Sequence, residues 1–300
     1  MLLILTGKKN ISPKTKRFIG LLKKNLSSSR VRSSSSSFEE MEVLINKADV
    51  KILVGGKSLD NWTTIFPRKV GRHSGLAFIL ASYARRKNIL FLDKFRESTN
   101  DITKLVQMFL FSVNKIPIPK TYYSPVYLPK HIRRAIEFLH FPIIIKQCNT
   151  SKGAGVSLVQ NKKMLTGQLV KTMKADPKKE IILQEFIPND FEYRIFVTGH
   201  KVAVAEKKIR ASKDEFRNNV HLGAREEFLD IKKVKKNILR TALRAAKVTN
   251  VQIAGVDITE DAQGNPVVFE VNSCPSFTLD SRISNEVEKL AEYLIECEGK

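Results

Sequence analysis

Residues 253–272 read IAGVDITEDAQGNPVVFEVN, two alternating strand-like segments joined through a Gly-Asn turn. Side chains alternate between the faces of a strand, so we expect Glu270 and Asn272 on one face of the second segment. Asp257, in the first segment, can lie beside them across the turn. Two carboxylates and an amide oxygen suit Mg²⁺, which keeps several waters and shares substrate phosphates. Because apolar residues surround Glu270, we favour a metal site over the alternative, the polar face of an exposed hairpin.

A glycine-containing loop, NTSKGAGV at residues 149–156, lies between two predicted strands upstream of this hairpin. Its small residues let the backbone approach a ligand, and successive N–H groups can surround phosphate oxygens. It is not a Walker loop, because no Gly-Lys-Ser/Thr opens a helix, and an ordinary hairpin loop is the alternative. Lys146 follows the apolar run at residues 143–145. A buried ammonium is costly without an anion, so an ATP phosphate is a reasonable partner for Lys146.

The first 90 residues alternate predicted strands and helices. Strands are expected at residues 1–7, 50–56 and 89–93, and helices at residues 14–26 and 74–88. This repeated β-α-β order implies a parallel sheet with right-handed crossovers. The opening MLLILTGKK is expected to be a strand and not a secretion signal, because it lacks a basic leader and a cleavage site.

Two further segments carry local predictions. Eight of the eleven residues at 27–37 are serine, which predicts a mobile surface loop, with a phosphorylated or RNA-contacting tract as the alternative. A helix is expected over residues 100–115, capped by Asn100 or Asp101. In the last third, residues 191–210 are expected to form a second hairpin that turns at Gly199-His200.

Several polar motifs follow one another in a fixed order along the chain. They are Lys104, Lys146, the glycine-containing loop, Gln184-Glu185-Phe186-Ile187, Arg194, Arg217-Asn218-Asn219, Asp257, and Glu270 with Asn272. In this order, and in the spacing of Phe66-Pro67-Arg68 and of residues 214–223, the chain resembles the ATP-grasp ligases. Within them it is similar to the RimK type, the ribosomal-protein glutamate ligases, and to relatives in amino-group-carrier-linked lysine and arginine synthesis. The resemblance covers nearly the whole chain.

The resemblance implies an ATP-grasp fold of mixed α/β and α+β class. An N-terminal lobe with a parallel sheet would occupy residues 1–92, and a central lobe with the glycine-rich loop would occupy residues 93–184. A C-terminal lobe with the metal site would occupy residues 185–300, with ATP enclosed between the last two lobes.

The resemblance also implies roles for individual residues. ATP would be bound by Lys104, Lys146, Ser151, Gly153, Gly155, Val156, Gln184, Glu185, Phe186, Ile187, Glu192, Arg217, Asn218 and Asn219. Arg210 and Arg217 would face the transferring phosphate as catalytic residues, with Lys208 as the alternative to Arg210. Asp257, Glu270 and Asn272 would bind about two Mg²⁺ ions, or Mn²⁺. Segment 276–280 departs from the ribosomal modifiers, in a region near the acceptor.

Charge is the strongest feature of the composition. The 300 residues hold 52 lysines and arginines against 30 acidic residues, a net charge of +22, and residues 1–90 contribute 18 basic against 5 acidic residues. Such a surface attracts nucleic acid, a ribosome or acidic peptides. No apolar run reaches the roughly 18 residues of a membrane span. Three scattered cysteines indicate reduced thiols, so we expect a cytoplasmic protein without a membrane partner.

The implied chemistry is ATP-driven joining of a carboxylate to an amine through an acylphosphate. We expect the addition of an amino acid such as glutamate to a protein, peptide or small-molecule carboxylate. The alternatives are a peptide macrocyclase of the same fold and a non-catalytic, nucleotide-gated basic binding protein. Because relatives form dimers and tetramers, a homo-oligomer is also expected.

Overall fold

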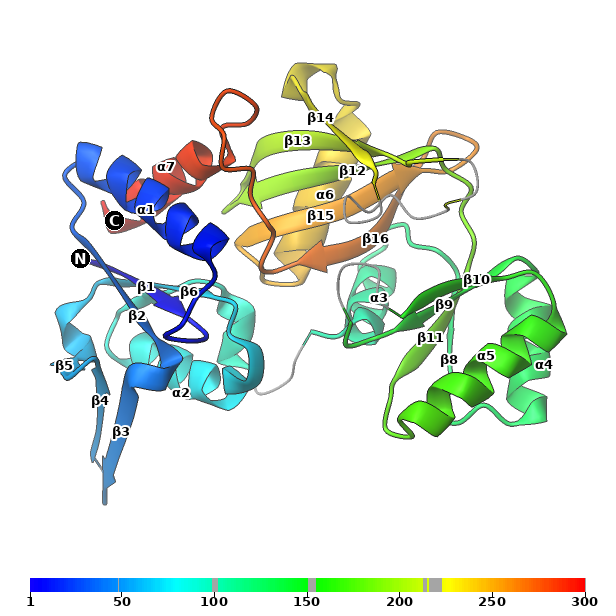
Figure 1. Cartoon of the computed structure of the whole chain (residues 1–300), viewed down its shortest axis with the longest axis horizontal. Coiled ribbons are helices and arrows are strands. Elements are labelled where there is room, and N and C mark those ends of the chain that lie inside the picture. Colours follow the sequence, from blue (N-terminus) through cyan, green and yellow to red (C-terminus); the bar gives the residue numbers. More distant parts are fainter. Residues whose placement is uncertain (48, 99–101, 151–154, 213–214, 216–222, 300) are drawn as a thin grey trace.

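The computed structural model describes residues 1–47, 49–98, 102–150, 155–212, 215 and 223–299. Figure 1 shows these residues arranged around three larger sheets, with a small hairpin sheet at one end. None of the helices in this part of the chain combines the length and the hydropathy that a bilayer span requires. Short 3₁₀ turns occupy Phe38–Glu40, Leu59–Asn61, Gly71–His73, Lys94–Glu97 and Ile231–Lys233.

The N-terminal sheet is parallel, as predicted, and is covered by a helix on each face. Its strand order is β2-β1-β6-β7, with bounds β1 Leu2–Thr6, β2 Ser33–Ser37, β6 Thr64–Arg68 and β7 Leu90–Phe91. Leu2 and Ile4 pack with Phe18 of α1 (Pro13–Ser28), whereas Leu3 packs with Leu80 of α2 (Ser74–Arg86). Both faces of β1 are therefore buried, which explains its continuous apolar sequence.

The prediction of a mobile loop for the serine tract is wrong. Residues Ser27 and Ser28 end α1, and Ser33–Ser37 form the edge strand β2, paired in parallel with β1. An edge strand needs backbone pairing more than apolar side chains, and two of its serines find partners. The Ser34 hydroxyl accepts from the Trp62 indole N–H at 2.8 Å, and the Ser35 hydroxyl accepts from the Lys23 ammonium at 2.9 Å.

Two other local predictions need correction. The strand predicted at residues 50–56 is β4 (Asp49–Val54), but it is not part of the parallel sheet. It pairs antiparallel with β3 (Met41–Asn46) and β5 (Lys57–Ser58), in the hairpin sheet that projects from the N-terminal lobe in Figure 1. The helix predicted over residues 100–115 is α3 (Lys104–Val113), and its N-cap is Thr103, whose hydroxyl accepts from the Val106 N–H.

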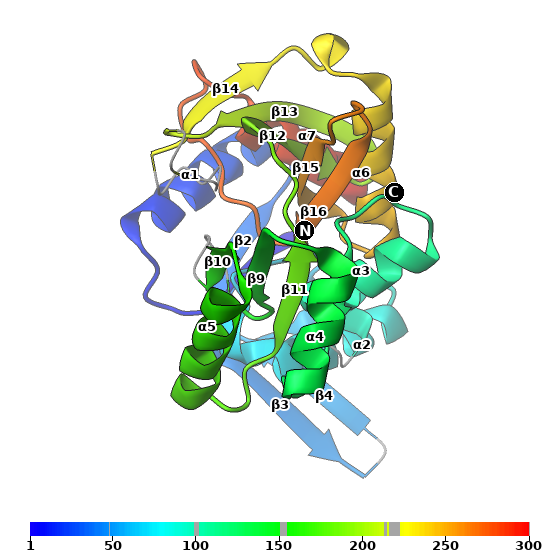
Figure 2. The same cartoon turned by 90° about the vertical axis from the view of Figure 1, so that its right-hand side faces the viewer.

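The central sheet is antiparallel in the order β10-β9-β11-β8. Its strands are β8 Thr121–Tyr123, β9 Ile143–Gln147, β10 Val156–Val159 and β11 Ile181–Glu185. Helices α4 (Pro129–Leu139) and α5 (Lys162–Ala175) pack on one face of it, and Figure 2 shows them side by side. Its other face is turned toward the C-terminal sheet, because Ile182 of β11 belongs to the same apolar cluster as Val256 and Val268.

The C-terminal sheet is antiparallel in the order β14-β13-β12-β15-β16. Its strands are β12 Phe191–Thr198, β13 Lys201–Ile209, β14 Arg225–Leu229, β15 Ile253–Glu260 and β16 Pro266–Asn272, so both predicted hairpins are confirmed. Helices α3 and α6 (Lys236–Val248) cover one face. Helix α7 (Glu286–Glu298) packs beside α1, and Figure 1 shows it joining the C-terminal sheet to the N-terminal lobe.

Candidate active site

A bidentate ion pair lies at the centre of the C-terminal sheet. Arg194 of β12 and Asp257 of β15 are paired directly across the two strands. The Arg194 Nε and Nη2 groups each donate to one Asp257 oxygen at 2.8 Å, and the Lys208 Nζ donates to Oδ1 at 3.3 Å. Burial acts to raise the pKa of Asp257, but the two cations outweigh it and hold that pKa well below its usual range. Asp257 is therefore ionised throughout the neutral range.

Lys208 joins this pair to a second carboxylate. It is 1% exposed, and its Nζ lies 3.5 Å from Oε1 of Glu192, its partner across β12 and β13. Burial, together with the negative charge of Asp257, raises the pKa of Glu192 to about 7. Glu192, expected among the ATP-binding residues, thus lies against Lys208 and exchanges a proton near neutral pH.

Glu270 and Asn272 lie beside Asp257, in agreement with the expected metal site. Asp257 and Glu270 are paired across β15 and β16, and the Asn272 Nδ2 donates to Asp257 Oδ2 at 3.0 Å. On its other side, Glu270 Oε1 lies 3.3 Å from the Nζ of Lys104, the first residue of α3. Lys104 also donates to the Thr150 carbonyl at 2.6 Å, so it connects the acid to the residue before the glycine-rich loop.

A bulge in β16 produces this arrangement. Ile258 pairs with Val268, whereas Asp257 pairs with Glu270, so Phe269 is an extra residue between the two pairs. Val268 belongs to the apolar cluster under α6, and Glu270 lies on the opposite side with Lys104. Without the extra residue, Phe269 would stand opposite Asp257, and Glu270 would point to the other face. The bulge is therefore what places both carboxylates on one face.

A second bulge places Lys208. Phe196 pairs with Val204, but Val197 pairs with Val202, so the register of the β12–β13 hairpin shifts by one residue there. In the unshifted register Lys207 would face Glu192, and Lys208 would point away from it. The structure thus brings Lys208 among the carboxylates. It places Arg210 elsewhere, in an ion pair with Asp190 just before β12.

Lys146 approaches from the central lobe. Its Nζ lies 5.1 Å from the centre of the Phe269 ring, which is a cation–π contact. Burial lowers the pKa of Lys146 to about 8, although the nearby charge of Glu270 opposes this shift. We call the following eight residues the polar cluster: Lys104, Lys146, Glu192, Arg194, Lys208, Asp257, Glu270 and Asn272. Its four cations outnumber its three carboxylates, so the polar cluster suits a polyanion.

The predicted adenine segment lies at the end of β11. Gln184 is buried, and its Nε2 donates to the Thr121 hydroxyl at 2.8 Å, while its Oε1 has no partner among the described residues. The Glu185 N–H donates to the Lys120 carbonyl, and the Lys120 N–H donates to the Glu185 carboxylate. Phe186 and Ile187 follow β11 in the connection to β12 and are half-buried.

Only part of the predicted glycine-rich loop can be described. Val156 begins β10 opposite Lys146, and Gly155 has a φ of +72°. This positive φ favours glycine, and a Cβ at position 155 would also make the Gln147 side chain, 2.5 Å away, move aside. Ser151, Gly153, Arg217, Asn218 and Asn219 lie outside the described residues.

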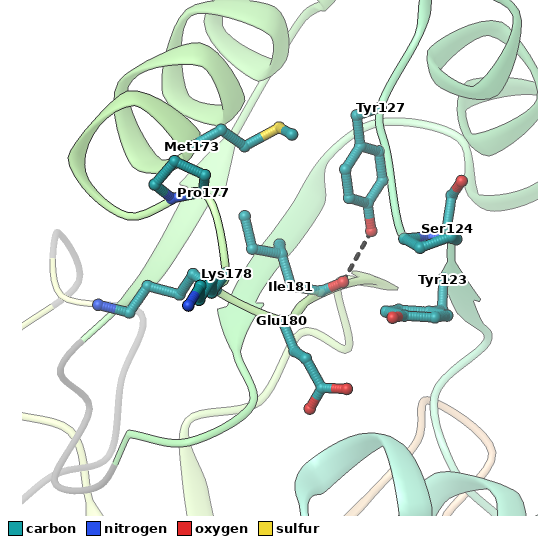
Figure 3. Close-up of a pocket in the computed structure, with 10 residues that line it drawn as sticks. Tyr123, Ser124, Tyr127, Met173, Pro177, Lys178, Glu180 and Ile181 are labelled. Carbon is teal, nitrogen blue, oxygen red and sulfur yellow. Dashed lines mark hydrogen bonds between the residues drawn. The ribbon is translucent and has the colours of Figure 1, made fainter.

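A small pocket of about 80 Å³ lies apart from the polar cluster, at the outer edge of the central sheet. Figure 3 shows the Tyr127 hydroxyl pointing to the Ile181 carbonyl, to which it donates at 2.7 Å. Tyr123, Met173 and Glu180 also line the pocket. None of its lining residues belongs to the polar cluster, so the pocket is a separate feature. We place the candidate active site at the polar cluster, because its charged residues suit a polyanion.

Comparison with known proteins gives this geometry a family. The model of the RimK-like ATP-grasp domain matches residues 100–294. The chain belongs to the RimK-like ATP-grasp family. A probable alpha-L-glutamate ligase of Methanococcoides burtonii is 31% identical over 252 residues, which cover 82% of this chain and 80% of that relative. This RimK-like chain is therefore an ATP-grasp ligase that forms a carbon–nitrogen bond.

Solved structures confirm the predicted ATP-grasp fold. The ATP-grasp ligase PsnB, in complex with its minimal precursor, Mg and ADP, matches with a TM-score of 0.70 and 18% identity, over 99% of this chain and 98% of that one. The macrocyclase MdnC of Microcystis aeruginosa, bound with precursor peptide MdnA, matches with a TM-score of 0.69 and 16% identity, over 99% of both chains.

Proposed function

We propose that this RimK-like ligase uses ATP and Mg²⁺ to join an acceptor carboxylate to the amine of an amino acid. Glutamate is the first candidate, because the similar proteins carry the name alpha-L-glutamate ligase. The observation that carries the proposal is the polar cluster, in which three carboxylates pair with three buried or half-buried cations and Lys146 adds a fourth positive charge close by. The excess of basic residues in positions 1–90 supports an acidic protein or peptide as the acceptor.

The donor set fits magnesium. In the described part of the chain no three His, Cys, Asp or Glu side chains are placed to hold a metal, so an amide would complete the set. Asp257 and Glu270 are paired across two strands, and Asn272 donates to Asp257 through its nitrogen, which leaves its carbonyl oxygen for a metal. Hard oxygen donors of this kind are what Mg²⁺ prefers. When bound, Mg²⁺ would neutralise phosphate charge and polarise the phosphorus–oxygen bond.

The remaining assignments follow the cation positions. Lys104 and Lys146 would bind the ATP phosphates, because they approach the carboxylates from two sides and carry the charge that phosphates need. The backbone of Ser151, Gly153, Gly155 and Val156 would lie over the phosphates, and that of Gln184, Glu185, Phe186 and Ile187 along the adenine. From the family resemblance, Arg217 and Asn219 would face the transferring phosphate, and Asn218 would contact the nucleotide. Arg210 would join them only by leaving its ion pair with Asp190, whereas Lys208 already lies among the carboxylates.

The reaction requires no nucleophile from the protein. An oxygen of the acceptor carboxylate would attack the γ-phosphorus, the bond to ADP would break, and an acylphosphate would form. The amine of the amino acid would then attack the acyl carbon, phosphate would leave, and the nitrogen would lose a proton. Lys104, Lys146 and Lys208 would offset the negative charge and align the reactants, which is the main work of a phosphoryl-transfer site.

The test is product mass together with ADP release. Purified protein is given ATP, Mg²⁺ and amino acids, singly and paired with glutamate-rich peptides. We expect the peptide to gain the mass of an amino acid less one water, and Glu270→Gln to abolish this gain. Glu137→Gln, an exposed change of the same kind on α4, is the matched control and should retain it.

Two results would contradict the proposal. A wild-type protein that neither binds nor hydrolyses ATP would refute it outright. A product that has lost one water without gaining an amino acid would instead identify a macrocyclase.

A further inference from the structure

Arg68 is a buried cation that forms no ion pair with any carboxylate in the described part of the chain. It is the last residue of β6 and is 6% exposed. Its Nη2 donates to the Pro275 carbonyl at 2.7 Å, and its guanidinium carbon lies 4.9 Å from the centre of the Phe277 ring and 5.3 Å from that of Phe18. Among the described residues, its Nη1 has no hydrogen-bond partner, and no ion pair is formed by this side chain.

The buried guanidinium of Arg68 lacks the ion pair that usually offsets the free-energy cost of burying a charge. Charged groups are costly to bury unless they are paired, and aromatic faces offset only part of the cost. Asp93, a buried carboxyl that interacts with Arg68, already accepts from the Gln252 and Ile253 backbone N–H groups through Oδ1. The Nη1 group of Arg68, which hydrogen-bonds to no described residue, therefore suits an anionic ligand.

The position of Arg68 in the sheet is that of a ligand site. In the order β2-β1-β6-β7, the chain leaves β1 toward β2 on one side and returns to β6 on the other. Small ligands of open parallel sheets bind at such a switch point, outside the carboxyl ends of the strands. Ser37, Thr6 and Arg68 end three adjacent strands in one register row, so their side chains share a face. The Ser37 hydroxyl also lacks a partner in the described part of the chain.

Arg68 is also linked to the polar cluster by direct packing. The Pro275 residue that it holds follows β16, and Figure 1 shows this segment passing between α1 and the C-terminal sheet. A Cβ at Gly255 would lie 3.0 Å from the Pro275 Cβ and 3.6 Å from the Arg194 Cδ. Arg194 in turn holds Asp257. A group bound at Arg68 is thus separated from the proposed metal ligands by the width of a few side chains.

We propose that Arg68 binds the α-carboxylate of the amino acid that supplies the amine, an inference that rests on the proposed function. The acceptor carboxylate must reach the phosphate at the polar cluster, whereas the carboxylate of the amine donor does not react and must be held aside. A guanidinium pairs with a carboxylate through two parallel hydrogen bonds, which fixes the orientation of the donor. Pro275 and Phe277 cover Arg68, so they must shift when the amino acid enters.

The test compares glutamate with isoglutamine, its neutral α-amide. In the wild type we expect glutamate to bind and react roughly 10- to 100-fold better than isoglutamine, because only glutamate can form a charged hydrogen-bonded pair with Arg68. Arg68→Gln should raise the KM for glutamate by a similar factor and leave the KM values for isoglutamine and ATP within about twofold. Arg68→Lys keeps the charge but cannot form two parallel hydrogen bonds, so its KM for glutamate should lie between those of the wild type and Arg68→Gln. Arg86→Gln, an exposed change at the end of α2, is the control.

Calorimetric titration of glutamate and isoglutamine separates this proposal from the proposed function. If the wild type joins no amino acid but binds glutamate, and Arg68→Gln does not, the Arg68 site stands and the ligase assignment falls. If Arg68→Gln weakens glutamate and isoglutamine equally, or lowers kcat for both, Arg68 only holds the Pro275 segment and the proposal is overturned. If Arg68→Gln does not fold, Arg68→Lys decides: an unchanged preference for glutamate over isoglutamine overturns the proposal.

Discussion

Glu192→Gln is expected to stabilise the protein at pH 8 and to have little effect at pH 5. Glu192 is mostly buried, with its side chain 14% exposed, and lies 3.5 Å from the Lys208 ammonium, which Asp257 also contacts. Burial, and then the charge of Asp257, raises the pKa of Glu192 from 4.5 to about 7. Glutamine keeps the shape and an oxygen that can accept from Lys208, but it cannot ionise.

The magnitude follows from this pKa. An unfolded glutamate loses its proton near pH 4.5, while folded Glu192 keeps it until about pH 7. Between these values the folded state binds more protons, so the free energy of unfolding falls as the pH rises. At 1.36 kcal/mol for each pH unit, full ionisation costs about 3 kcal/mol. The stabilisation by glutamine should therefore be about 2.5 kcal/mol larger at pH 8 than at pH 5.

Urea unfolding of the two proteins at pH 5 and pH 8, followed by circular dichroism, measures this difference. Glu137→Gln is the control, because that exposed carboxylate on α4 should give the same small effect at both pH values. An equal change for Glu192→Gln at pH 5 and pH 8 would refute the reasoning. It would mean that Glu192 ionises at its ordinary pH and that Lys208 fully compensates its burial.

Three further predictions concern Lys146 and the N-terminal lobe. ATP affinity should fall as the pH rises through about 8, because Lys146 loses its charge there. In binding assays, Lys146→Met should bind ATP more weakly than the wild type, and its affinity should depend less on pH. Gly7→Ala should destabilise the protein by about 1–3 kcal/mol in urea unfolding, because its Cβ would lie 1.9 Å from the Lys69 carbonyl oxygen. Gly20→Ala, in open space on α1, should instead stabilise it by about 0.5–1 kcal/mol.

Local pattern predicted most of the elements, because their cause is local. Period-two alternation around Gly264-Asn265 and Gly199-His200 predicts both C-terminal hairpins, and the structure confirms them. Helix α1 follows from apolar residues at helical spacing among lysines. The ATP-grasp fold itself came from the order of the motifs along the whole chain, which no single hairpin determines.

The failures occurred where a distant neighbour decides the structure. Ser33–Ser37 has no apolar side chain to indicate a strand, but buried β1 supplies a complete row of backbone partners. The β-α-β order predicts that the strand at residues 50–56 belongs to the parallel sheet. In the structure it pairs instead with β3, its neighbour in the sequence. The Phe66-Pro67-Arg68 motif supports the family resemblance, but it does not indicate a ligand site at Arg68, because Pro275 and Phe277 come to lie over that side chain only in the folded structure.

The candidate site shows most clearly why composition and spacing are not enough. A turn at Gly264-Asn265, followed without interruption, puts Asp257 opposite Phe269 and on the wrong face for Glu270. The bulge shifts the register by one residue and so pairs Asp257 with Glu270.

The β12–β13 hairpin repeats the argument, since only its bulge brings Lys208 to Glu192 and Asp257. A one-residue shift exchanges the two faces of a strand, so each bulge decides which charges meet. The sequence shows which residue types are present in the polar cluster. Whether they lie together depends on one extra residue in each hairpin, which alternation alone does not predict. The two irregular positions, and not the regular strands, therefore assemble the proposed active site.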